Sequence, residues 1–493
     1  MATIAEALAL ALDHHLAGRL AEAQELYHRI LDAEPDQPDA LHFLGVLAGQ
    51  VGEHALGLQL IGRALAQRLD AADMHANIAN VWRAAARPAE AVASYRRAIA
   101  LQPGFAEAWT DLANTLHHSG DTRRAIAALE RAVATAPALD VARERLGALL
   151  HERGRLLVEA GMGVESLPVL ARAAALLPLD ADIAFLHGNA LFALGLREDS
   201  LAAYRNALAI TPDFPSAALN LGIALGAVDR LPESAAALEC AARLDVRHTE
   251  AIDRLVVALA LLGREEEAVA WGERALALKD RAALAHAPAL PALPATPRDA
   301  EARRRKVIAF ALTGSGEKAM GGLLQNLSLA SALHPGWDCR VYHDHALPAA
   351  VLAELAELTA AGAALVPVPM AGDPDGAYAR LAVADDPAVE RFLCRDATVL
   401  LTPSQADAVA AWEASGLPFH VMRDGVLDTE MMPGGQWGGI AGLLPDLLPL
   451  VDRYAAAEPD ADRFLRRIVW PMIRDRALVH DRHHRRHGLP FPG

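Results

Sequence analysis

The chain has 493 residues, more than one compact domain usually holds, so we expect at least two folding units. Its 46 Lys and Arg residues against 62 Asp and Glu residues give a formal net charge of -16, which argues against nucleic acid or an anionic membrane as the main partner. The three cysteines, Cys240, Cys339 and Cys394, are too few and too far apart for a disulfide framework or a Cys-rich zinc module, so a reducing, cytoplasmic location is expected.

The N-terminal segment is apolar but predicts an amphipathic helix. Glu6 and Asp13 interrupt the apolar stretch that a signal peptide needs, and no basic leader precedes them. No other window offers the roughly 18 consecutive apolar residues that a membrane span requires. We therefore expect a soluble protein without a membrane span.

The first half of the chain repeats itself every 34 residues. Prolines keep this step at Pro103 and Pro137 and again at Pro178 and Pro212. Small and large residues keep it too, since Ala91, Tyr95 and Ala98 are followed by Ala125, Leu129 and Ala132. The frames start at residues 4, 38, 72, 106, 140, 181, 215 and 249. Such a period predicts stacked helical hairpins, because one hairpin cannot bury its apolar stripe alone.

The repeat resembles the tetratricopeptide repeat (TPR). In that family a large residue and Leu-Gly mark the first helix, and two small residues around an aromatic mark the second, with Pro near the end. Matching residues here are Ala23, Tyr27, Pro35, Leu44, Gly45, Trp82, Tyr95 and Trp109. The resemblance implies an α-solenoid superhelix of about eight repeats over residues 4–282, whose concave groove binds a protein or peptide.

The frame that starts at residue 140 holds seven residues more than the others. Seven residues are close to two α-helical turns, so a first helix longer by about 10 Å would keep its buried face in phase. Gly154, within the same frame, favours an insertion loop instead. Both interpretations stay open at the level of the sequence.

Helical periodicity stops after Asp280, where a proline-rich segment begins. Its four prolines have a spacing that excludes a helix and favours extended polyproline geometry. They are Pro288, Pro291, Pro294 and Pro297. We therefore expect a semi-rigid Pro/Ala-rich linker at residues 283–305. The basic run from Arg303 to Lys306 fits a solvated linker end better than a nucleic-acid contact, because the chain is acidic.

From residue 306 the pattern changes to alternating strands and helices. Apolar runs that predict buried strands are at residues 307–314, 339–344, 364–370, 392–401 and 418–424, with helical stretches at 322–333, 348–359 and 403–415. The alternation predicts a three-layer α/β domain over residues 306–482 with a mostly parallel sheet. Ligand sites of such sheets lie at the carboxyl ends of the strands.

The first two strand ends carry candidate ligand residues. The loop that starts at Thr313 and Gly314 lacks the Walker pattern around Lys318, so NTP hydrolysis is not expected. Its backbone amides suit a diphosphate at the helix that follows, and a plain strand-to-helix turn is the other interpretation. Asp344 ends the second strand, where it suits a ribose or serves as an ordinary loop or cap residue.

The region from Val307 to Asp481 resembles the C-terminal domain of bacterial TPR-fused, nucleotide-diphosphosugar-transferase-like proteins. The segments that carry the resemblance include HPGWDCRVYHDHALPAAVL, ADDPAVERFLCRDATVLL and RFLRRIVWPMIRDRALVHD. The resemblance implies the GT-A glycosyltransferase fold, a nucleotide-sugar donor, a protein or glycan acceptor, and a divalent cation, Mn²⁺ or Mg²⁺.

The predicted strand that contains Arg395 carries the family's metal motif in altered form. The family has Arg-Asp-Ala-Asp-Ser, whose two carboxylates would hold the cation against the donor diphosphate. Here Asp396 matches the first carboxylate and Thr398 replaces the second. A neutral hydroxyl removes both charge and a strong ligand, which weakens the case for metal binding and for catalysis. Arg395 would partly offset the loss by contacting a donor phosphate.

The next motif of the resemblance is HVMRD, which ends in Arg423 and Asp424. Asp424 is the candidate catalytic base for an acceptor hydroxyl, with Arg423 at the donor, or the two form a structural ion pair. The Gly-rich segment 435–439 retains the family's turn. Trp437, within it, stacks on a donor sugar ring or belongs to the core.

The chain ends in a His- and Arg-rich segment. His480 is a candidate for the further metal ligand that GT-A transferases often take from a C-terminal His. Residues 483–493 are expected to form a mobile, solvated tail.

Two hypotheses for function follow. In the first, the TPR superhelix recruits an acceptor and the second domain, a glycosyltransferase, moves a sugar to it from a nucleotide-sugar. In the alternative, which Thr398 favours, the chain is a non-catalytic TPR adaptor for protein–protein interaction that carries a degenerate transferase domain.

Overall fold

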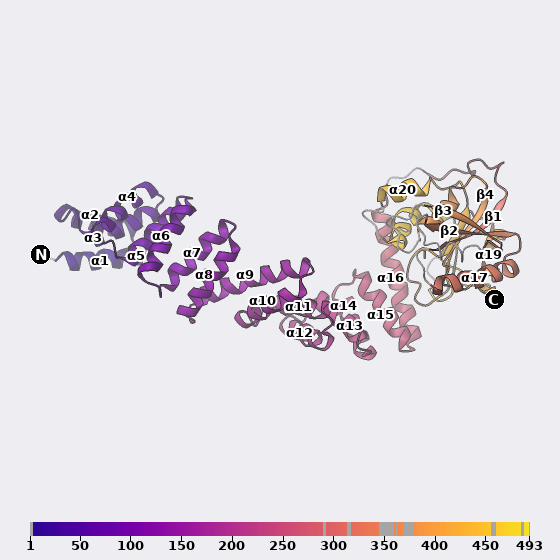
Figure 1. The fold of residues 1–493 in the computed structure, drawn as a ribbon, viewed down its shortest axis with the longest axis horizontal. Helices are drawn as coiled ribbons and strands as arrows, with labels where there is room; N and C mark the ends of the chain where they lie inside the picture. The colour runs from indigo at the N-terminus through magenta and orange to yellow at the C-terminus, as the bar shows by residue number, and fades with distance from the viewer. Residues whose placement is uncertain are drawn as a thin grey trace. The chain divides into compact units, whose positions relative to one another are not determined.

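The computed structural model describes residues 3–288, 292–312, 317–344, 359–360, 362–368, 378–454, 460–484 and 488–492, without the side chains of 317, 318 and 344. The chain divides into two compact units, Met1–Pro212 and Asp213–Gly493, which we describe in turn. Figure 1 shows helical hairpins in both units and a sheet in the second.

The first unit is an array of antiparallel helical hairpins. Its helices are α1 (Ile4–Leu16), α2 (Leu20–Ala33), α3 (Pro38–Gln50), α4 (His54–Gln67), α5 (Ala72–Ala84), α6 (Pro88–Leu101), α7 (Ala106–His118), α8 (Thr122–Thr135), α9 (Asp140–Glu159), α10 (Gly163–Leu176), α11 (Ala181–Ala193) and α12 (Arg197–Ile210). The first helix of each hairpin begins at the residue where a sequence frame begins. The repeat pattern therefore placed these helix starts correctly.

Small residues at the repeat positions let neighbouring helices approach closely. Ala91, Tyr95 and Ala98 are fully buried on one face of α6, and the Tyr95 hydroxyl donates to Asn80 Oδ1 of α5 at 2.6 Å. At Gly45 of α3 a Cβ atom would lie 2.6 Å from the Ile61 side chain of α4. The two helices of a hairpin can pack this tightly only where one of them carries no side chain.

The seven extra residues of the fifth frame extend a helix. α9 is continuous for 20 residues and passes through Gly154, whereas α7 has 13. A Cβ at Gly154 would lie 2.4 Å from Leu170 of α10. This glycine therefore serves close helix packing, and the insertion-loop interpretation is wrong.

The second unit begins with two further hairpins and continues into the α/β domain. The hairpins are α13 (Pro215–Gly226) with α14 (Leu231–Leu244) and α15 (Thr249–Leu261) with α16 (Glu265–Ala285). α16 has 21 residues, and its end packs on the α/β domain. Lys279 is 3% exposed and donates to Asp253 of α15 and to Glu430 of the α/β domain at 2.9 and 2.6 Å. The Trp470 indole also donates to Asp280 at 3.0 Å.

The segment after α16 is anchored to the domain. Residues 289–291 lie outside the described part of the chain. Arg303 is buried, and its Nη1 donates to the carbonyls of Asp386 and Val389 at 2.5 and 2.7 Å. Arg298 forms an ion pair with Asp446 at 2.6 Å. The solvated linker end that we expected at Arg303–Lys306 is wrong for Arg303, because this side chain satisfies backbone carbonyls inside the domain, whereas Arg304 and Arg305 are exposed.

The described residues of the α/β domain form one seven-stranded sheet with the order β3-β2-β1-β4-β6-β5-β7. Its strands are β1 (Arg305–Leu312), β2 (Trp337–Asp344), β3 (Ala363–Val368), β4 (Val389–Arg395), β5 (Phe419–Arg423), β6 (Gln436–Ile440) and β7 (Ala477–Asp481). Among the described strands, only β6 runs antiparallel to its neighbours, which are β4 and β5. The predicted mostly parallel sheet is therefore present.

Alternate residues of β1 face two separate cores. Ile308 and Phe310 pack towards α17 (Glu317–Leu333) and α19 (Pro403–Ser415). Val307 and Ala309 pack towards the other layer. Its helices are η1 (Ala379–Ala384), α20 (Leu447–Tyr454), α21 (Ala461–Phe464), η2 (Leu465–Val469) and α22 (Trp470–Ile473), with η3 (Arg474–Arg476) before β7. The domain has three layers, as predicted, and most of the helix expected at 348–359 lies outside the described residues.

Two predictions about the later part of the domain are wrong. The Gly-rich segment at 435–439 is not a turn but mostly strand β6, where a Cβ at Gly438 would lie 2.3 Å from the Phe392 carbonyl oxygen. Glycine lets a central strand lie against a close neighbour. The expected solvated tail also packs: His484 is fully buried and its ring bonds to the Val426 carbonyl at 2.9 Å.

In the part of the chain that the structure describes, no helix has both the length and the apolar character needed to cross a bilayer.

Candidate functional site

The candidate site lies at the carboxyl ends of the parallel strands. The chain runs from β1 outward to β2 and β3 and then returns to β4 on the other side of β1. The strand order thus reverses at the β1–β4 boundary, and ligand sites of such sheets lie outside the carboxyl ends of the strands at a reversal of this kind. The loop after β4 begins at this boundary and carries the sequence motif that contains Asp396.

Helix α17 fixes the loop that follows β4. Asn326 of α17 donates to the carbonyls of Ala397 and Val399 at 3.3 and 3.0 Å and accepts from the Leu401 amide at 2.8 Å. At Gly322, one turn earlier, a Cβ would lie 2.4 Å from the Ala397 carbonyl oxygen. A glycine and an amide side chain thus hold the backbone around Asp396 in one conformation.

Thr398 closes a turn on the Asp396 carboxylate. The Thr398 amide and hydroxyl both donate to Asp396 Oδ1 at 2.8 Å. Thr398, which stands where the sequence resemblance has a second carboxylate, therefore also occupies one oxygen of Asp396. Among the described residues, no three His, Cys, Asp or Glu side chains come together as ligands of a metal ion. This donor set does not fit a divalent cation, which prefers several anionic oxygens.

Asp424 lies at the same edge, directly after β5, and its side chain is 20% exposed. It pairs with Arg482 at 2.5 Å and accepts from Gln405 Nε2 of α19 at 3.2 Å. The Arg482 guanidinium, which is 42% exposed, also donates to Ser404 at 2.6 Å. Asp424 therefore pairs with Arg482 and does not form the expected ion pair with Arg423.

Gln436 connects the two acidic candidates. Gln436 pairs with Arg395 in the β4–β6 ladder, and Arg395 directly precedes Asp396 in the sequence. The Gln436 Oε1 accepts from the Asp424 amide at 3.3 Å. A Cβ at the preceding residue, Gly435, would lie 3.0 Å from the Asp396 Cβ. The structure thus brings Asp396 and Asp424, 28 positions apart in the chain, to one edge of the sheet.

Arg395 lies in the interior. It is 3% exposed, and its Nη1 donates to the Cys394 carbonyl at 2.8 Å. Its Nε and Nη2 have no hydrogen-bond partner among the described residues. Burial lowers the pKa of this guanidinium to about 10. We find no described side-chain partner that explains a buried charge here, and a ligand at the strand ends would not reach it in this conformation.

Arg423 is a structural cation. Both Arg423 and Asp481 are fully buried, and they form an ion pair at 2.6 Å between the ends of β5 and β7. Burial lowers the pKa of Arg423, and the Asp481 carboxylate opposes that shift. The Asp481 carboxylate also accepts from the amides of His483 and His484. The donor-binding role predicted for Arg423 has no support in its surroundings.

Trp437 and His480 are core residues. Trp437 is fully buried and packs edge-on against Phe392, with ring centroids 5.0 Å apart. His480 is 3% exposed, and its Nδ1 lies 2.9 Å from Nε2 of the buried His420. Burial lowers the pKa of both histidines. Sugar stacking and metal ligation are therefore not open to these side chains in this conformation.

The remaining candidates belong to parts of the chain without a side-chain description. Thr313 and Gly314 lie outside the described residues. Asp344 is the last residue of β2, and its side chain is also outside the description. Their predicted contacts with a nucleotide-sugar stay predictions.

Sequence reasoning missed the polar side chains that surround the two acids. Gln405 comes from α19, Gln436 from β6 and Arg482 from the chain directly after β7, and they meet only in the folded domain. No local pattern singles out a Gln in a helix, and Arg482 is the last residue before the segment that we expected to form a solvated tail.

Two family matches cover parts of the helical array. Residues 83–155 match the family described as tetratricopeptide repeat, and residues 188–228 match the family described as TPR repeat. The array therefore contains tetratricopeptide repeats, and such repeats indicate protein–protein interaction. A comparison with curated proteins finds no match.

Solved structures similar to this chain include several TPR proteins. YrrB, described as a TPR protein with an unusual peptide-binding site, is 21% identical, with 39% of this chain and 95% of its own covered and a TM-score of 0.29. A tetratricopeptide repeat protein from Parabacteroides merdae is 15% identical, with 52% and 98% covered and a TM-score of 0.30. The C-terminal part of a TPR protein from Cytophaga hutchinsonii is 13% identical, with 50% and 99% covered and a TM-score of 0.36.

Proposed function

We propose that this protein recruits a protein or peptide acceptor through its tetratricopeptide repeats and transfers a sugar to it from a nucleotide-sugar bound at the strand ends of the α/β domain. The observation that carries the proposal is that Asp396 and Asp424 follow the carboxyl ends of β4 and β5 at one edge of the sheet, near the polar side chains of Gln436 and Gln405. An interior Asp396 remote from Asp424 would have argued against it.

The proposed chemistry uses side chains of this chain and no divalent cation. A bond forms between the acceptor oxygen and the anomeric carbon of the sugar, while the bond from that carbon to the diphosphate oxygen breaks. Asp424 takes the proton of the acceptor hydroxyl. Arg482, which is 42% exposed beside Asp424, supplies positive charge for the departing diphosphate. Asp396 accepts hydrogen bonds from the donor through its second carboxylate oxygen.

Calorimetric titration of the full chain with a panel of nucleotide-sugars, with and without Mn²⁺, tests this function. We expect saturable binding of at least one donor that Mn²⁺ does not strengthen. Asp396→Ala should weaken the binding, and Asp424→Asn should abolish transfer while donor binding persists. The matched control is Asp338→Ala, because Asp338 lies near the amino end of β2 and is 55% exposed. Absence of binding for every donor, or equal effects of the two alanine variants, contradicts the proposal.

A second candidate is a non-catalytic TPR adaptor, and the geometry of Thr398 favours it. Thr398 supplies a neutral hydroxyl in place of a second carboxylate, and this hydroxyl also donates to Asp396 Oδ1. A metal ion would therefore lack one carboxylate ligand and find one oxygen of the other already occupied. Thr398→Asp separates the candidates. If the domain is a decayed transferase, the variant gains Mn²⁺-dependent donor binding that the natural chain lacks. If the site works without metal, the natural chain binds the donor already and the variant gains no Mn²⁺ dependence.

A further inference from the structure

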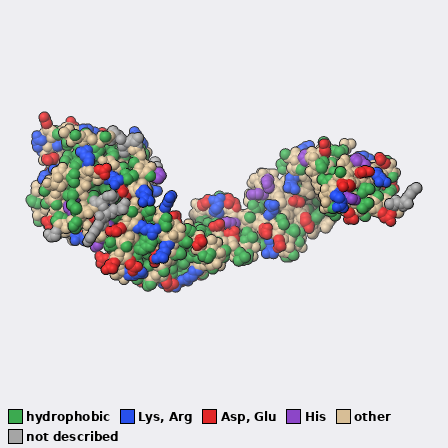
Figure 2. Space-filling model, turned by 180° about the vertical axis from the view of Figure 1, so that it is seen from behind, with side chains coloured by type: hydrophobic (Ala, Val, Ile, Leu, Met, Phe, Trp, Pro, Cys, Tyr) green, Lys and Arg blue, Asp and Glu red, His purple; other side chains and the backbone are tan. Residues whose placement is uncertain are grey.

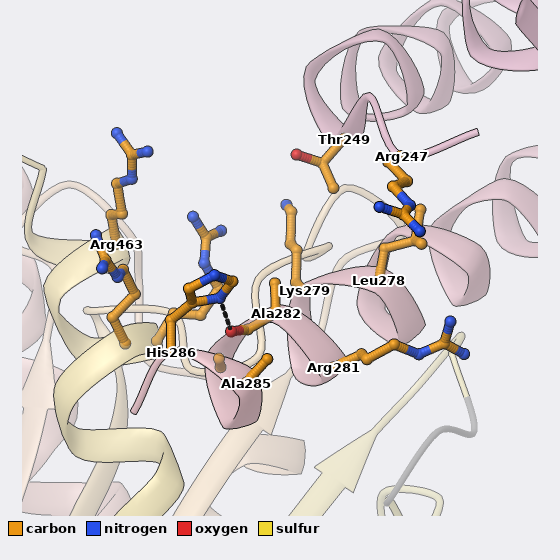
Figure 3. Close-up of a pocket in the computed structure, with 12 residues that line it drawn as sticks. Arg247, Thr249, Leu278, Lys279, Arg281, Ala282, Ala285, His286 and Arg463 are labelled. Carbon is orange, nitrogen blue, oxygen red and sulfur yellow. Dashed lines mark hydrogen bonds between the residues drawn. The ribbon is translucent and has the colours of Figure 1, made fainter. Parts of the chain in front are cut away.

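A cationic cavity lies in the second unit, away from the motifs discussed above. It has a volume of about 630 Å³ and is lined by the loop before α15, the last turns of α16, and α21 with η2 (Figure 3). Its cationic lining residues are Arg247, Lys279, Arg281, Arg463, Arg466 and Arg467. No Asp or Glu is among the described residues that line it. Figure 3 shows Arg463 on one side, Arg247 and Arg281 on the other, and between them Lys279 of α16 and His286, which directly follows that helix.

This lining differs from the mixed charge on the face drawn in Figure 2. The chain carries a formal charge of -16, and on the face drawn in Figure 2 acidic and basic side chains are interspersed. Six cations around one cavity repel one another, and each long side chain also loses conformational freedom when it is held there. A bound anion would remove the repulsion.

Nearby acids compensate only part of the charge. Glu430 accepts from both Lys279 and Arg466, at 2.6 and 2.7 Å, and Asp253 lies 2.8 Å from Lys279. Arg247 and Arg281 are exposed, and their guanidinium groups form no hydrogen bond or ion pair with any described residue. These two arginines are therefore available to a ligand.

We propose that this cavity binds a small polyanion that carries two or more phosphate groups. Guanidinium groups match phosphate oxygens with paired hydrogen bonds, and several separate cations favour a ligand with several separate charges. The volume lies in the range of small-molecule sites. The cavity shares no residue with the strand-end site, so this ligand is additional to a nucleotide-sugar.

Binding would also tie the last repeat to the α/β domain. The ligand would contact α15 and α16 on one side and α21 with η2 on the other, and the buried Lys279 already joins these elements through Asp253 and Glu430. A ligand that binds the folded unit and not the unfolded chain raises the melting temperature of that unit.

Calorimetric titration of the full chain with inorganic triphosphate tests the proposal. We expect saturable binding at one site per chain that weakens as ionic strength rises. The variant Arg247→Ala/Arg281→Ala should bind about tenfold or more weakly, because two charged hydrogen-bond donors are lost. The control is Arg243→Ala/Arg254→Ala, which removes the same charge from two arginines of α14 and α15 that do not line the cavity and pair with Glu239 and Glu250. Its affinity should be unchanged.

Three results would overturn the proposal: no binding of triphosphate, equal loss in both double variants, or binding of citrate as tight as that of triphosphate. Binding of an acidic peptide without any binding of triphosphate would assign the cavity to a protein partner instead. All four substituted arginines lie on the surface, so folding should persist. The melting temperature of the full chain, measured with and without triphosphate, provides a second readout. A rise in the natural chain that is absent from the cavity variant supports the proposal.

Discussion

The buried ion pair between Arg423 and Asp481 gives the sharpest test of what the HVMRD segment does in the α/β domain. Arg423→Met keeps most of the volume of the side chain and removes its charge. Among the described residues, it leaves the Asp481 carboxylate, which is 0% exposed, with only the amides of His483 and His484 as partners. Breaking a buried pair in this way costs about 3–5 kcal/mol, because the remaining charge stays desolvated.

The assay is differential scanning calorimetry of the full chain. For a unit as large as Asp213–Gly493, each kcal/mol shifts the melting temperature by about 2 °C, so the transition of this unit should fall by about 6–10 °C. The matched control is Arg482→Met. Arg482 and Asp424 join the ends of the same two strands, but their side chains are 42% and 20% exposed. An exposed pair contributes about 1 kcal/mol or less, so this shift should stay within about 2 °C.

A different pattern would refute the structural role of Arg423. If Arg423→Met melts within about 2 °C of the natural chain and binds nucleotide-sugar more weakly, the side chain serves the ligand, as the family resemblance implied. If Arg423→Met and Arg482→Met lower the melting temperature equally, burial does not explain how much the Arg423–Asp481 pair contributes to stability.

Two further predictions concern packing and pH. Gly154→Ala should destabilise the first unit by about 1–3 kcal/mol, because its Cβ would lie 2.4 Å from Leu170. Gly62→Ala should stabilise this unit by about 0.5–1 kcal/mol, because a Cβ there would have nothing within 4 Å. Calorimetry of both variants checks the opposite signs. Burial raises the pKa of Asp385 from 3.8 to about 6, so its contribution to stability is complete below pH 3.8 and is lost as the pH rises towards 6. Asp385→Asn should therefore gain melting temperature relative to the natural chain between pH 4 and 7, and a constant difference over this range would contradict the prediction.

The helical array could be predicted almost residue by residue, and the reason is local. Each repeat must bury the same stripe against its neighbour, so the spacing of Ala91, Tyr95 and Ala98 is fixed by contacts within about 34 residues. The bounds of α19 could be predicted for the same reason. Thr402 caps its start, Pro403 occupies its first turn, and Gly416 ends it with a φ of 71°. These signals depend on a few neighbouring residues.

Features that depend on distant partners were not visible in the sequence. Strand β6 contains two glycines at 438 and 439 and resembles a turn in isolation, but close neighbours on both sides demand glycine there. The basic run that begins at Arg303 predicted a solvated linker end. Arg303 is instead buried and donates to the carbonyls of Asp386 and Val389, which are more than 80 positions away in the sequence. A charged residue shows its burial only when its partners are known.

The same distinction changes what the transferase resemblance means. Three of the residues that carry it, Arg395, Arg423 and Trp437, are buried, so packing inside the domain accounts for them in this structure. Chemistry depends instead on side chains that a substrate can reach. Of the candidates whose side chains are described, Asp396 and Asp424 are the partly exposed ones, and one of them is held by Thr398. A test of function in this domain therefore has to substitute Asp396, Asp424 or Thr398. Substitution of the buried motif residues can also unfold the domain, so a loss of activity in such variants would not distinguish lost chemistry from lost folding.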